Sequence, residues 1–352
     1  MGITTKDLAQ LCGVSRTTVH RALYGGGRIR QDTKEMILRI AREHDYRPDL
    51  LARGLVKGRT YYIGVVVMDV KNRYFSAMLS AISREAIRRG YNVNIALHGN
   101  DRELERKQLM TLASYRMDGI ILSSVNEGEE YREFLESLGV PVVSVDNRIA
   151  DGIPFVSIDQ RLAMREAAKR ALEKSYERIV FVCPAMAESA SQNTYVHQER
   201  MNGFSEAVKE AEHVQVEWLL DWTYVEKAAE LVKDGVRTAF VCTADDFALD
   251  IMKRLKEEGK RAPEDYGIIG FDNIDTLNYV VPRLVTISNA VDAVAEAAVC
   301  RLFELIDAGA EEPCQEREEQ LAADTCLEGE EEANGKTQDW ILPYEAVDGE
   351  TL

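Results

Sequence analysis

The stretch Ile3-Thr-Thr-Lys-Asp-Leu-Ala-Gln-Leu-Cys-Gly-Val-Ser-Arg-Thr-Thr-Val-His-Arg-Ala-Leu23 decides the fold of the N-terminus. Thr4 is placed to cap a helix, and Asp7 three residues later favours the positive end of that helix. Gly13 suits the left-handed residue that ends a helix, and Ser15 is placed to cap the next one. We therefore predict two short helices joined by a tight turn, which is the outline of a helix-turn-helix.

The second of these helices has two chemically different sides. At about 100° per residue, Val19, Ala22 and Leu23 fall on one side and are expected to be buried. The opposite side carries Arg16, Thr17, His20, Arg21 and Tyr24. Guanidinium and hydroxyl groups on such a face suit the major groove of DNA, although a solvated helical pair is the alternative interpretation. The residues expected to contact DNA here are Thr5, Ser15, Arg16, Thr17, Thr18, His20, Arg21 and Arg28.

The charge of the chain is distributed unevenly. The 352 residues carry a formal net charge of −17, which is unfavourable for a protein that meets DNA along its whole length. Residues 1–59 nevertheless hold 12 Lys and Arg against 6 Asp and Glu, whereas residues 309–352 hold 2 against 14. Only the N-terminal segment is therefore suited to bind phosphates.

The sequence predicts a cytoplasmic protein without a membrane partner, because no apolar run approaches membrane-spanning length and no signal peptide precedes the first helix. The cysteines have no paired or metal-ligand spacing, which fits thiols in a reducing compartment. Their positions are Cys12, Cys183, Cys242, Cys300, Cys314 and Cys326. We predict no metal site, no cofactor and no catalytic residue.

From Tyr62 onward, short apolar strands alternate with longer amphipathic helices, which predicts parallel sheets flanked by helices. The strands expected first are 63–67, 92–97, 119–123, 141–145 and 155–158. A second set is expected at 178–183, 214–219, 238–242 and 267–271. Helices are expected, for instance, at 75–89, 160–174, 246–258 and 290–307. Two such sets predict an α/β fold with two doubly wound subdomains and a cleft between them.

Polar residues follow the ends of these strands, where ligands bind in open parallel sheets. Carboxylates and Arg can hold adjacent hydroxyls, and aromatic rings can cover the apolar face of a sugar. Each of these residues taken alone is more often an ordinary loop residue, but their shared placement favours a ligand site. The candidates are Asp69, Tyr74, Phe75, Ser123, Asp146, Arg200, Trp222, Asp245 and Asp272.

Several motifs near the N-terminus together point to a known family. They are Thr4-Thr-Lys-Asp-Leu-Ala9, Gly13-Val-Ser15, Thr18-Val-His-Arg21, Tyr46-Arg-Pro48, Leu51-Ala-Arg-Gly-Leu55 and Ile63-Gly-Val65. With these motifs, residues 3–62 resemble the headpiece and hinge of the LacI/GalR family of bacterial transcription regulators. His20, Tyr24 and Gly54 depart from the residues common in that family.

The resemblance implies a short hinge helix that folds on operator DNA, with Ala52, Arg53 and Leu55 at the DNA and Leu55 wedged into the minor groove. Judged from its residues alone, the segment 49–58 could equally be a plain linker, because a helix of this length is unstable by itself.

The later part of the chain resembles the effector-binding core of the same family, which is similar to periplasmic sugar-binding proteins. The motifs are Ile63-Gly-Val-Val-Val67, Met117-Asp-Gly-Ile-Ile121, Val140-Pro-Val-Val-Ser-Val-Asp146, Arg200-Met-Asn-Gly-Phe204, Asp245-Asp-Phe-Ala248, Gly267-Ile-Ile-Gly-Phe-Asp-Asn273 and Leu284-Val-Thr-Ile287. The resemblance implies that Asp146, Arg200, Asp245 and Asp272 touch the effector. Ala244 stands where the family usually has Asn.

We expect four segments: a helix-turn-helix domain at 1–48, a hinge at 49–59, an α/β effector-binding and dimerisation core at 60–329, and an acidic tail at 330–352. A final strand is expected at 325–328, and partial disorder is expected in the tail. The predicted function is a homodimeric repressor that binds a palindromic operator and responds to a small carbohydrate effector.

Two other classes are weighed against this prediction. A carbohydrate-active enzyme could use the paired carboxylates of Asp245 and Asp246, but adjacent residues at one helix start rarely converge on a substrate. A stand-alone sugar-binding protein would carry the basic headpiece without using it. Neither alternative accounts for a capped helix-turn-helix at the N-terminus.

Overall fold

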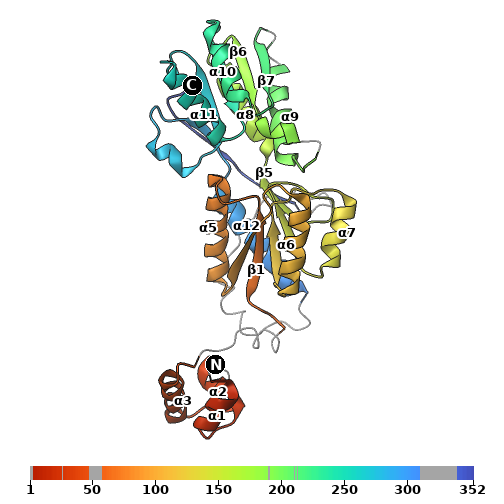
Figure 1. Cartoon of the computed structure of the whole chain (residues 1–352), viewed down its shortest axis with the longest axis vertical. Helices are drawn as coiled ribbons and strands as arrows, with labels where there is room; N and C mark the ends of the chain where they lie inside the picture. Colours follow the sequence, from red (N-terminus) through yellow and green to blue (C-terminus); the bar gives the residue numbers. More distant parts are fainter. Residues whose placement is uncertain are drawn as a thin grey trace. The chain divides into compact units, whose positions relative to one another are not determined.

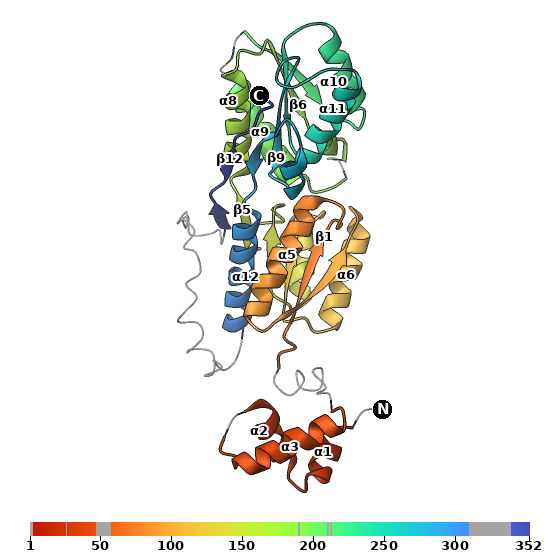
Figure 2. The same cartoon turned by 90° about the vertical axis from the view of Figure 1, so that its left-hand side faces the viewer.

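The structure is a computed structural model of the chain (Figures 1 and 2), and it describes residues 3–25, 27–46, 58–188, 191–209, 211, 213–309 and 339–352. The chain divides into two compact units, Met1–Thr60 and Tyr61–Leu352. The predicted hinge contacts Ala52, Arg53 and Leu55 lie outside the described residues, as does the strand predicted at 325–328.

The N-terminal unit has the predicted helix-turn-helix. Its described helices are α1 (Thr5–Leu11), α2 (Arg16–Tyr24) and α3 (Gln31–Glu43). The Thr4 hydroxyl accepts a hydrogen bond from the Asp7 backbone N–H at 3.3 Å, and Asp7 Oδ2 accepts one from the Thr4 N–H at 2.9 Å. This reciprocal cap begins α1, and Gly13 with φ +64° allows the turn into α2.

A small apolar core joins the three helices. Leu8 of α1, Val19 of α2 and Ile37 of α3 are each fully buried and belong to one cluster. Each such side chain contributes roughly 1.5–3 kcal/mol when it leaves water. Because the buried residues of α2 all face this cluster, the opposite side of the helix stays exposed.

The second unit is built from two α/β halves, as predicted. The first half contains β1 (Tyr62–Val67), β2 (Asn92–Leu97), β3 (Gly119–Leu122), β4 (Val142–Val145) and β5 (Phe155–Ile158). Its helices are α5 (Arg73–Arg88), α6 (Arg102–Ser114), α7 (Glu129–Ser137) and α12 (Val291–Ala308). Helices α5 and α12 cover one face of the sheet, and α6 and α7 cover the other (Figure 1). The central strands are therefore apolar on both faces.

The second half repeats this arrangement. Its strands are β6 (Arg178–Val182), β7 (Gln215–Leu219), β8 (Thr238–Cys242), β9 (Gly267–Asp272) and β10 (Val285–Ser288). Its helices are α8 (Gln160–Leu172), α9 (Tyr195–Lys209), α10 (Tyr224–Lys233) and α11 (Asp245–Glu257). Helices α8 and α9 lie on one face and α10 and α11 on the other (Figure 2). Each of the nine predicted strands is present, with bounds within one residue of the prediction.

Helices α8 and α9 approach each other very closely at Gly203. A Cβ atom at this position would lie 2.0 Å from the Arg161 carbonyl oxygen, so only glycine fits there. The contact fixes the orientation of α9, which carries Arg200 toward the sheet ends.

The described chain passes between the two halves at three places. It crosses from β5 to α8 at Asp159, from β10 to α12 at Asn289 and Ala290, and from β11 (Asp339–Leu342) to β12 (Glu345–Val347). The sheet orders are β11-β5-β4-β3-β1-β2 and β12-β10-β9-β8-β6-β7. These crossings are the segments about which the two halves can move relative to each other.

The expectation of a tail with partial disorder is wrong for residues 339–352. Strand β11 pairs in parallel with β5, and β12 pairs antiparallel with β10, so the C-terminus adds one strand to each sheet. The buried Thr351 hydroxyl donates to the Ile268 carbonyl at 2.7 Å and accepts from the Val285 N–H at 3.0 Å. The apolar run Trp340–Tyr344 is too short to predict a strand from the sequence. The strand is stabilised by its pairing within the sheet.

Two further findings concern membranes and thiols. Within the residues that the structure describes, no helix is long and apolar enough to cross a membrane. Cys12, Cys183 and Cys242 are free and buried, as expected for apolar thiols.

Candidate functional site

Helix α2 presents the surface predicted to meet DNA. Ser15 Oγ accepts a hydrogen bond from the Thr18 backbone N–H at 3.1 Å and shares one with the Thr18 hydroxyl at 2.9 Å. The side chains of Ser15 and Thr18 therefore hold the start of the helix. Arg16, Thr17, His20 and Arg21 are exposed, whereas Val19 is fully buried. The exposed face thus combines two guanidinium groups with the positive end of a helix, which suits binding to an anionic polymer.

The other predicted DNA-contacting residues occupy different places in the N-terminal unit. Thr5 is partly buried, and its hydroxyl lies 2.9 Å from the Tyr46 hydroxyl. Arg28 is exposed in the loop before α3. The rings of His20 and Tyr24 pack at a centroid distance of 4.9 Å, so these two departures from the family pattern lie next to each other.

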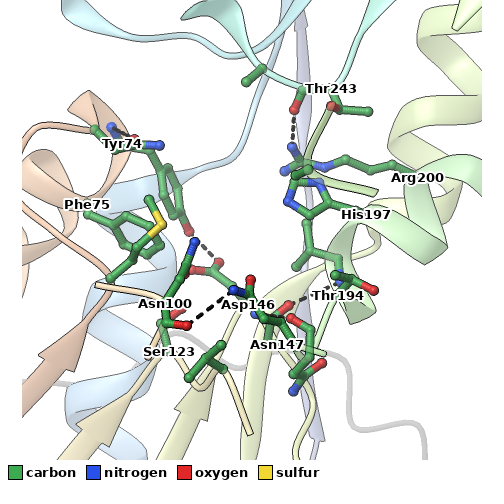
Figure 3. A pocket seen from close by; sticks show the side chains of 18 of the residues that line it. Tyr74, Phe75, Asn100, Ser123, Asp146, Asn147, Thr194, His197, Arg200 and Thr243 are labelled. Carbon is green, nitrogen blue, oxygen red and sulfur yellow. Dashed lines mark hydrogen bonds between the residues drawn. The ribbon is translucent and has the colours of Figure 1, made fainter. Parts of the chain in front are cut away.

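A cavity of about 270 Å³ lies between the two halves of the second unit, at the carboxyl ends of strands from both sheets (Figure 3). Tyr74, Phe75, Ser123 and Asp146 line it from the first half, and Arg200, Trp222 and Asp272 line it from the second. The structure thus brings together seven of the nine residues proposed from the sequence. Their convergence follows from the parallel sheets, whose strand ends face one another.

Asp146 is the first charged group of the cavity. It is buried, and its Oδ1 atom accepts a hydrogen bond from the Tyr74 hydroxyl, while its Oδ2 atom has no hydrogen-bond partner among the described residues. Burial raises the pKa of Asp146 to about 6, although the Tyr74 hydrogen bond and the Arg200 charge oppose this rise. A buried acceptor without a partner is costly, so Oδ2 is suited to receive a donor from a ligand.

Arg200 is held firmly by the protein itself. Its Nε atom donates to Gln160 Oε1 at 2.9 Å, Nη1 donates to the Thr243 carbonyl, and Nη2 lies 3.5 Å from Asp272 Oδ1. The guanidinium also stacks 3.7 Å from the centre of the Phe271 ring. All three nitrogen atoms are engaged, so the group is an oriented part of the cavity wall.

Asp272 lies next to Arg200 in the cavity wall. Burial raises the pKa of Asp272 to about 7, and the neighbouring Arg200 charge limits the rise. Asn289 Nδ2 donates to Asp272 Oδ1 at 3.3 Å. At neutral pH, this carboxyl group is therefore close to its midpoint between the charged and neutral forms.

Three polar residues of the cavity lining have a strained backbone. They are Asn100, which lies after β2, Asp146, which lies after β4, and Asp272, which is the last residue of β9. Their φ values are +63°, +62° and +110°, respectively. Residues other than glycine avoid this region unless the surroundings hold them there. Such strain concentrates at functional sites, and here it turns the side chains into the cavity.

Two predicted residues do not line the cavity. The Asp69 carboxylate accepts hydrogen bonds from the N–H groups of Lys71 and Asn72, at 2.9 and 3.0 Å, and so shapes the turn before α5. Asp245 is fully buried, and its oxygens accept from the Thr286 hydroxyl at 2.6 Å and the Ile274 N–H at 2.9 Å. The Asp245 carboxylate therefore binds groups of the protein interior, whereas the sequence led us to expect that it would contact ligand hydroxyls.

Sequence reasoning missed several polar residues of the cavity lining. His197 lies three residues before Arg200 on α9, so helical spacing could have placed both on one face. The others include His98, Asn100, Asn147, Gln192, Asn193 and Asn289. Gln192 and Asn193 come from an irregular segment before α9, where no periodic pattern signals which side chains point inward.

A second layer of hydrogen bonds supports the first-half wall of the cavity. His98 Nε2 lies 3.0 Å from the Ser123 carbonyl, and its Nδ1 atom accepts from the Asn100 N–H at 3.2 Å. The fully buried Glu105 accepts from the Ser124 hydroxyl and the Val125 N–H, both at 2.7 Å. These contacts fix the segment after β3 and orient the polar groups that face the cavity.

An exposed basic helix in a helix-turn-helix unit, together with a two-sheet unit that encloses a polar cavity, defines a class of DNA-binding proteins with a small-molecule-binding core. Residues 4–49 match the model of the bacterial regulatory proteins of the lacI family, and residues 168–323 match that of the periplasmic binding protein-like domain. The repressor PurR of Vibrio vulnificus (strain CMCP6) is 30% identical over 312 residues, which cover 86% of this chain and 92% of that protein.

Solved structures show the same fold. The lac repressor dimer bound to operator and the anti-inducer ONPF superimposes with a TM-score of 0.78 at 20% identity, covering 100% of this chain and 99% of that one. A periplasmic binding protein/LacI transcriptional regulator from Alkaliphilus metalliredigens QYMF complexed with D-xylulofuranose gives a TM-score of 0.66 at 24% identity, covering 83% and 98%. The chain belongs to the lacI family, and it is a DNA-binding transcription regulator modulated by a ligand.

Proposed function

We propose that the protein is a homodimeric repressor whose affinity for a palindromic operator changes when a small carbohydrate binds in the cavity. The observation that carries the proposal is the Asp146 Oδ2 atom, which has no hydrogen-bond partner in the described part of the chain and belongs to a cavity whose walls come from both halves. A ligand hydroxyl that donates to this atom would also touch the second half, and so would favour one relative position of the halves.

The chemistry of the cavity suits a carbohydrate. Amide side chains of Asn100, Asn147, Gln192 and Asn193 lie along the lining, and amides can donate to and accept from hydroxyl groups. The rings of Tyr74, Phe75 and Trp222 supply apolar surface for the C–H face of a sugar. The regulator from Alkaliphilus metalliredigens, which shares the fold, is complexed with a sugar.

A homodimer is supported by exposed apolar side chains on the second unit. Tyr279 and Val281 are 87% and 82% exposed, and Ile87 on α5 is 62% exposed. Tyr279 and Val281 are two residues apart and would gain from burial against a partner, and the lac repressor that shares the fold is a dimer bound to operator. A twofold dimer would place two copies of α2 on two half-sites, which explains the expectation of a palindromic operator. Because the target is DNA, we place the protein in the cytoplasm.

The DNA contacts proposed are Thr5, Ser15, Arg16, Thr17, Thr18, His20, Arg21 and Arg28 from the helical unit, with Ala52, Arg53 and Leu55 from the hinge. We keep the division into 1–48, 49–59 and a core from residue 60, and we extend the core through the strands at 339–352.

A non-enzymatic role is part of the proposal. The PurR relative is a transcriptional repressor. The carboxylate pair considered for glycosidase chemistry, Asp245 and Asp246, does not line the cavity, and Asp245 is committed to Thr286 and Ile274. These two groups therefore cannot flank a glycosidic bond in the way that hydrolysis requires.

The test is an operator titration with the full-length protein. An operator would first be selected from a random DNA pool, and its dissociation constant would then be measured with and without each sugar of a panel. We expect a change of about 5- to 150-fold with the effector. Asp146→Asn should retain operator binding and lose most of the response, because the acceptor Oδ2 is replaced. Equal operator affinity of the wild type under all conditions would refute the proposed function.

A further inference from the structure

His197 is a cavity residue that the proposed function does not yet use. It lies on α9 one helical turn before Arg200, and its imidazole faces the cavity on the side opposite Asp146 (Figure 3). Its Nδ1 atom is buried and has no hydrogen-bond partner in the described part of the chain. Among the described residues that line the cavity, two buried side-chain atoms therefore lack a hydrogen-bond partner, Asp146 Oδ2 from the first half and His197 Nδ1 from the second.

The imidazole of His197 is uncharged at physiological pH. Burial, together with the positive charge of Arg200, lowers the pKa of His197 to about 3. A neutral imidazole has one N–H donor and one acceptor nitrogen, and it offers no charge to a ligand. His197 is thus suited to a hydroxyl or another neutral polar group.

Among the described residues that line the cavity, Arg200 carries the one permanent positive charge, and this charge is already paired inside the protein. Its Nε and Nη1 atoms donate to Gln160 and to the Thr243 carbonyl, and Nη2 forms an ion pair with Asp272 at 3.5 Å. The two carboxyl groups in the lining, Asp146 and Asp272, would repel an anion. A phosphate or carboxylate placed here would have to compete with Asp272 for the Arg200 guanidinium and would also face Asp146, so the loss of its hydration would be poorly compensated.

We infer that the cavity selects an uncharged ligand and that His197 is a specificity-determining residue for it. In this arrangement, one hydroxyl of the ligand donates to Asp146 Oδ2 from the first half, and a second polar group hydrogen-bonds to the His197 imidazole from the second half. The inference rests on the proposed function and narrows its effector to a neutral polyhydroxylated compound, as opposed to a phosphorylated or acidic sugar.

The ligand class is tested by thermal shift and calorimetry on the full-length protein at pH 7.5. The probes are D-ribose, D-xylulose, D-glucose and cellobiose, compared with ribose 5-phosphate, glucose 6-phosphate and glucuronate. We expect binding within the neutral set, and at least about 10-fold weaker binding of a charged counterpart. A charged compound that binds as tightly as its neutral counterpart, or more tightly, overturns the inference while the proposed function stands. If no compound binds and operator affinity never changes, both are refuted.

The role of His197 is tested with two variants and a control. His197→Leu removes both polar atoms at similar volume, and we expect the dissociation constant of the best neutral probe to rise about 10-fold or more. His197→Gln keeps a donor and an acceptor, so it should stay within about 3-fold of wild type. Gln198→Leu makes the same kind of change one residue further along α9, outside the cavity lining, and should bind like wild type.

These variants separate a direct role from a structural one. A general loss of structure would affect His197→Gln and Gln198→Leu as well, and it would lower the melting temperature of the unliganded protein. Wild-type affinity in His197→Leu overturns the assignment of His197, and so does a failure of His197→Gln to restore binding.

Discussion

The side chains of Gln160 and Asn289, 129 residues apart in the sequence, are joined by a hydrogen bond of 3.1 Å where two chain segments cross between the halves of the second unit. Gln160 Oε1 also accepts from Arg200 Nε, and Asn289 Nδ2 also donates to Asp272 Oδ1. Arg200 and Asp272 approach to 3.5 Å, so the four side chains form a closed ring. The ring links the charged groups of the cavity to the segments about which the halves can move.

Gln160→Met should uncouple the cavity from the crossings. Gln160 does not line the cavity, and Met has a similar volume but cannot bond to Arg200, Asn289 or the Ser157 hydroxyl. We expect the effector-induced change in operator affinity to fall at least about 3-fold, because the ring no longer transmits a shift of Arg200. Operator titration with and without effector measures this. Gln215→Met, at an exposed position of β7, is the control. A full response in Gln160→Met would exclude the ring from the coupling.

Asp272→Asn should flatten the dependence of stability on pH. Burial holds the pKa of Asp272 at about 7, above the ordinary value of about 3.9, so the folded state binds this proton more tightly than the unfolded state. The free energy of unfolding therefore falls as pH rises from about 4 to 7, and this contribution is absent in the variant. Melting curves between pH 5 and 8 measure it, with Glu217→Gln on exposed β7 as the control. An unchanged slope in Asp272→Asn would contradict the raised pKa.

Asp245→Ala should destabilise the second half of the core. The substitution leaves the Thr286 hydroxyl and the Ile274 N–H without their partner inside a fully buried site. We expect a loss of about 2 kcal/mol in the free energy of unfolding, measured by urea denaturation. Asp245→Asn, which keeps the shape, should lose less. If Asp245→Ala keeps wild-type stability but loses the effector response, this result would instead support the direct ligand contact that was expected from the sequence.

Much of the architecture could be predicted because its signals are local. The caps at Thr4 and Ser15, the glycine at position 13 and the apolar runs of the strands each depend on a few neighbouring residues. Polar residues after parallel strands converge for geometric reasons, and so Asp146 and Asp272 were found. Asp245 was misplaced because it starts a helix, and sequence alone does not reveal that Thr286 and Ile274 lie within reach of its carboxylate.

The features that sequence reasoning missed depend on contacts between distant segments. The run Trp340–Leu342 is too short to signal a strand, and it becomes one because β5 offers a free edge. Gln160 and Asn289 are ordinary polar residues until the crossings bring them together. His197 could have been suspected from its spacing to Arg200, but only the fold shows that its Nδ1 atom has no hydrogen-bond partner among the residues described.

Arg21→Ala should weaken operator binding without affecting the core. Arg21 is exposed on the face of α2 opposite the buried Val19 and Ala22, where a guanidinium can reach a base edge or a phosphate. We expect a loss of at least about 1 kcal/mol, or roughly 5-fold in affinity. If Arg21 contacts a phosphate, the slope of the logarithm of affinity against the logarithm of salt concentration should also become shallower by about 1, because one counterion fewer is released. Footprinting titrations at several salt concentrations measure both quantities. Arg39→Ala is the matched control, because Arg39 is exposed on α3 and pairs with Glu43 at 3.5 Å. Unchanged affinity in Arg21→Ala, or an equal loss in Arg39→Ala, would remove Arg21 from the DNA-contacting surface.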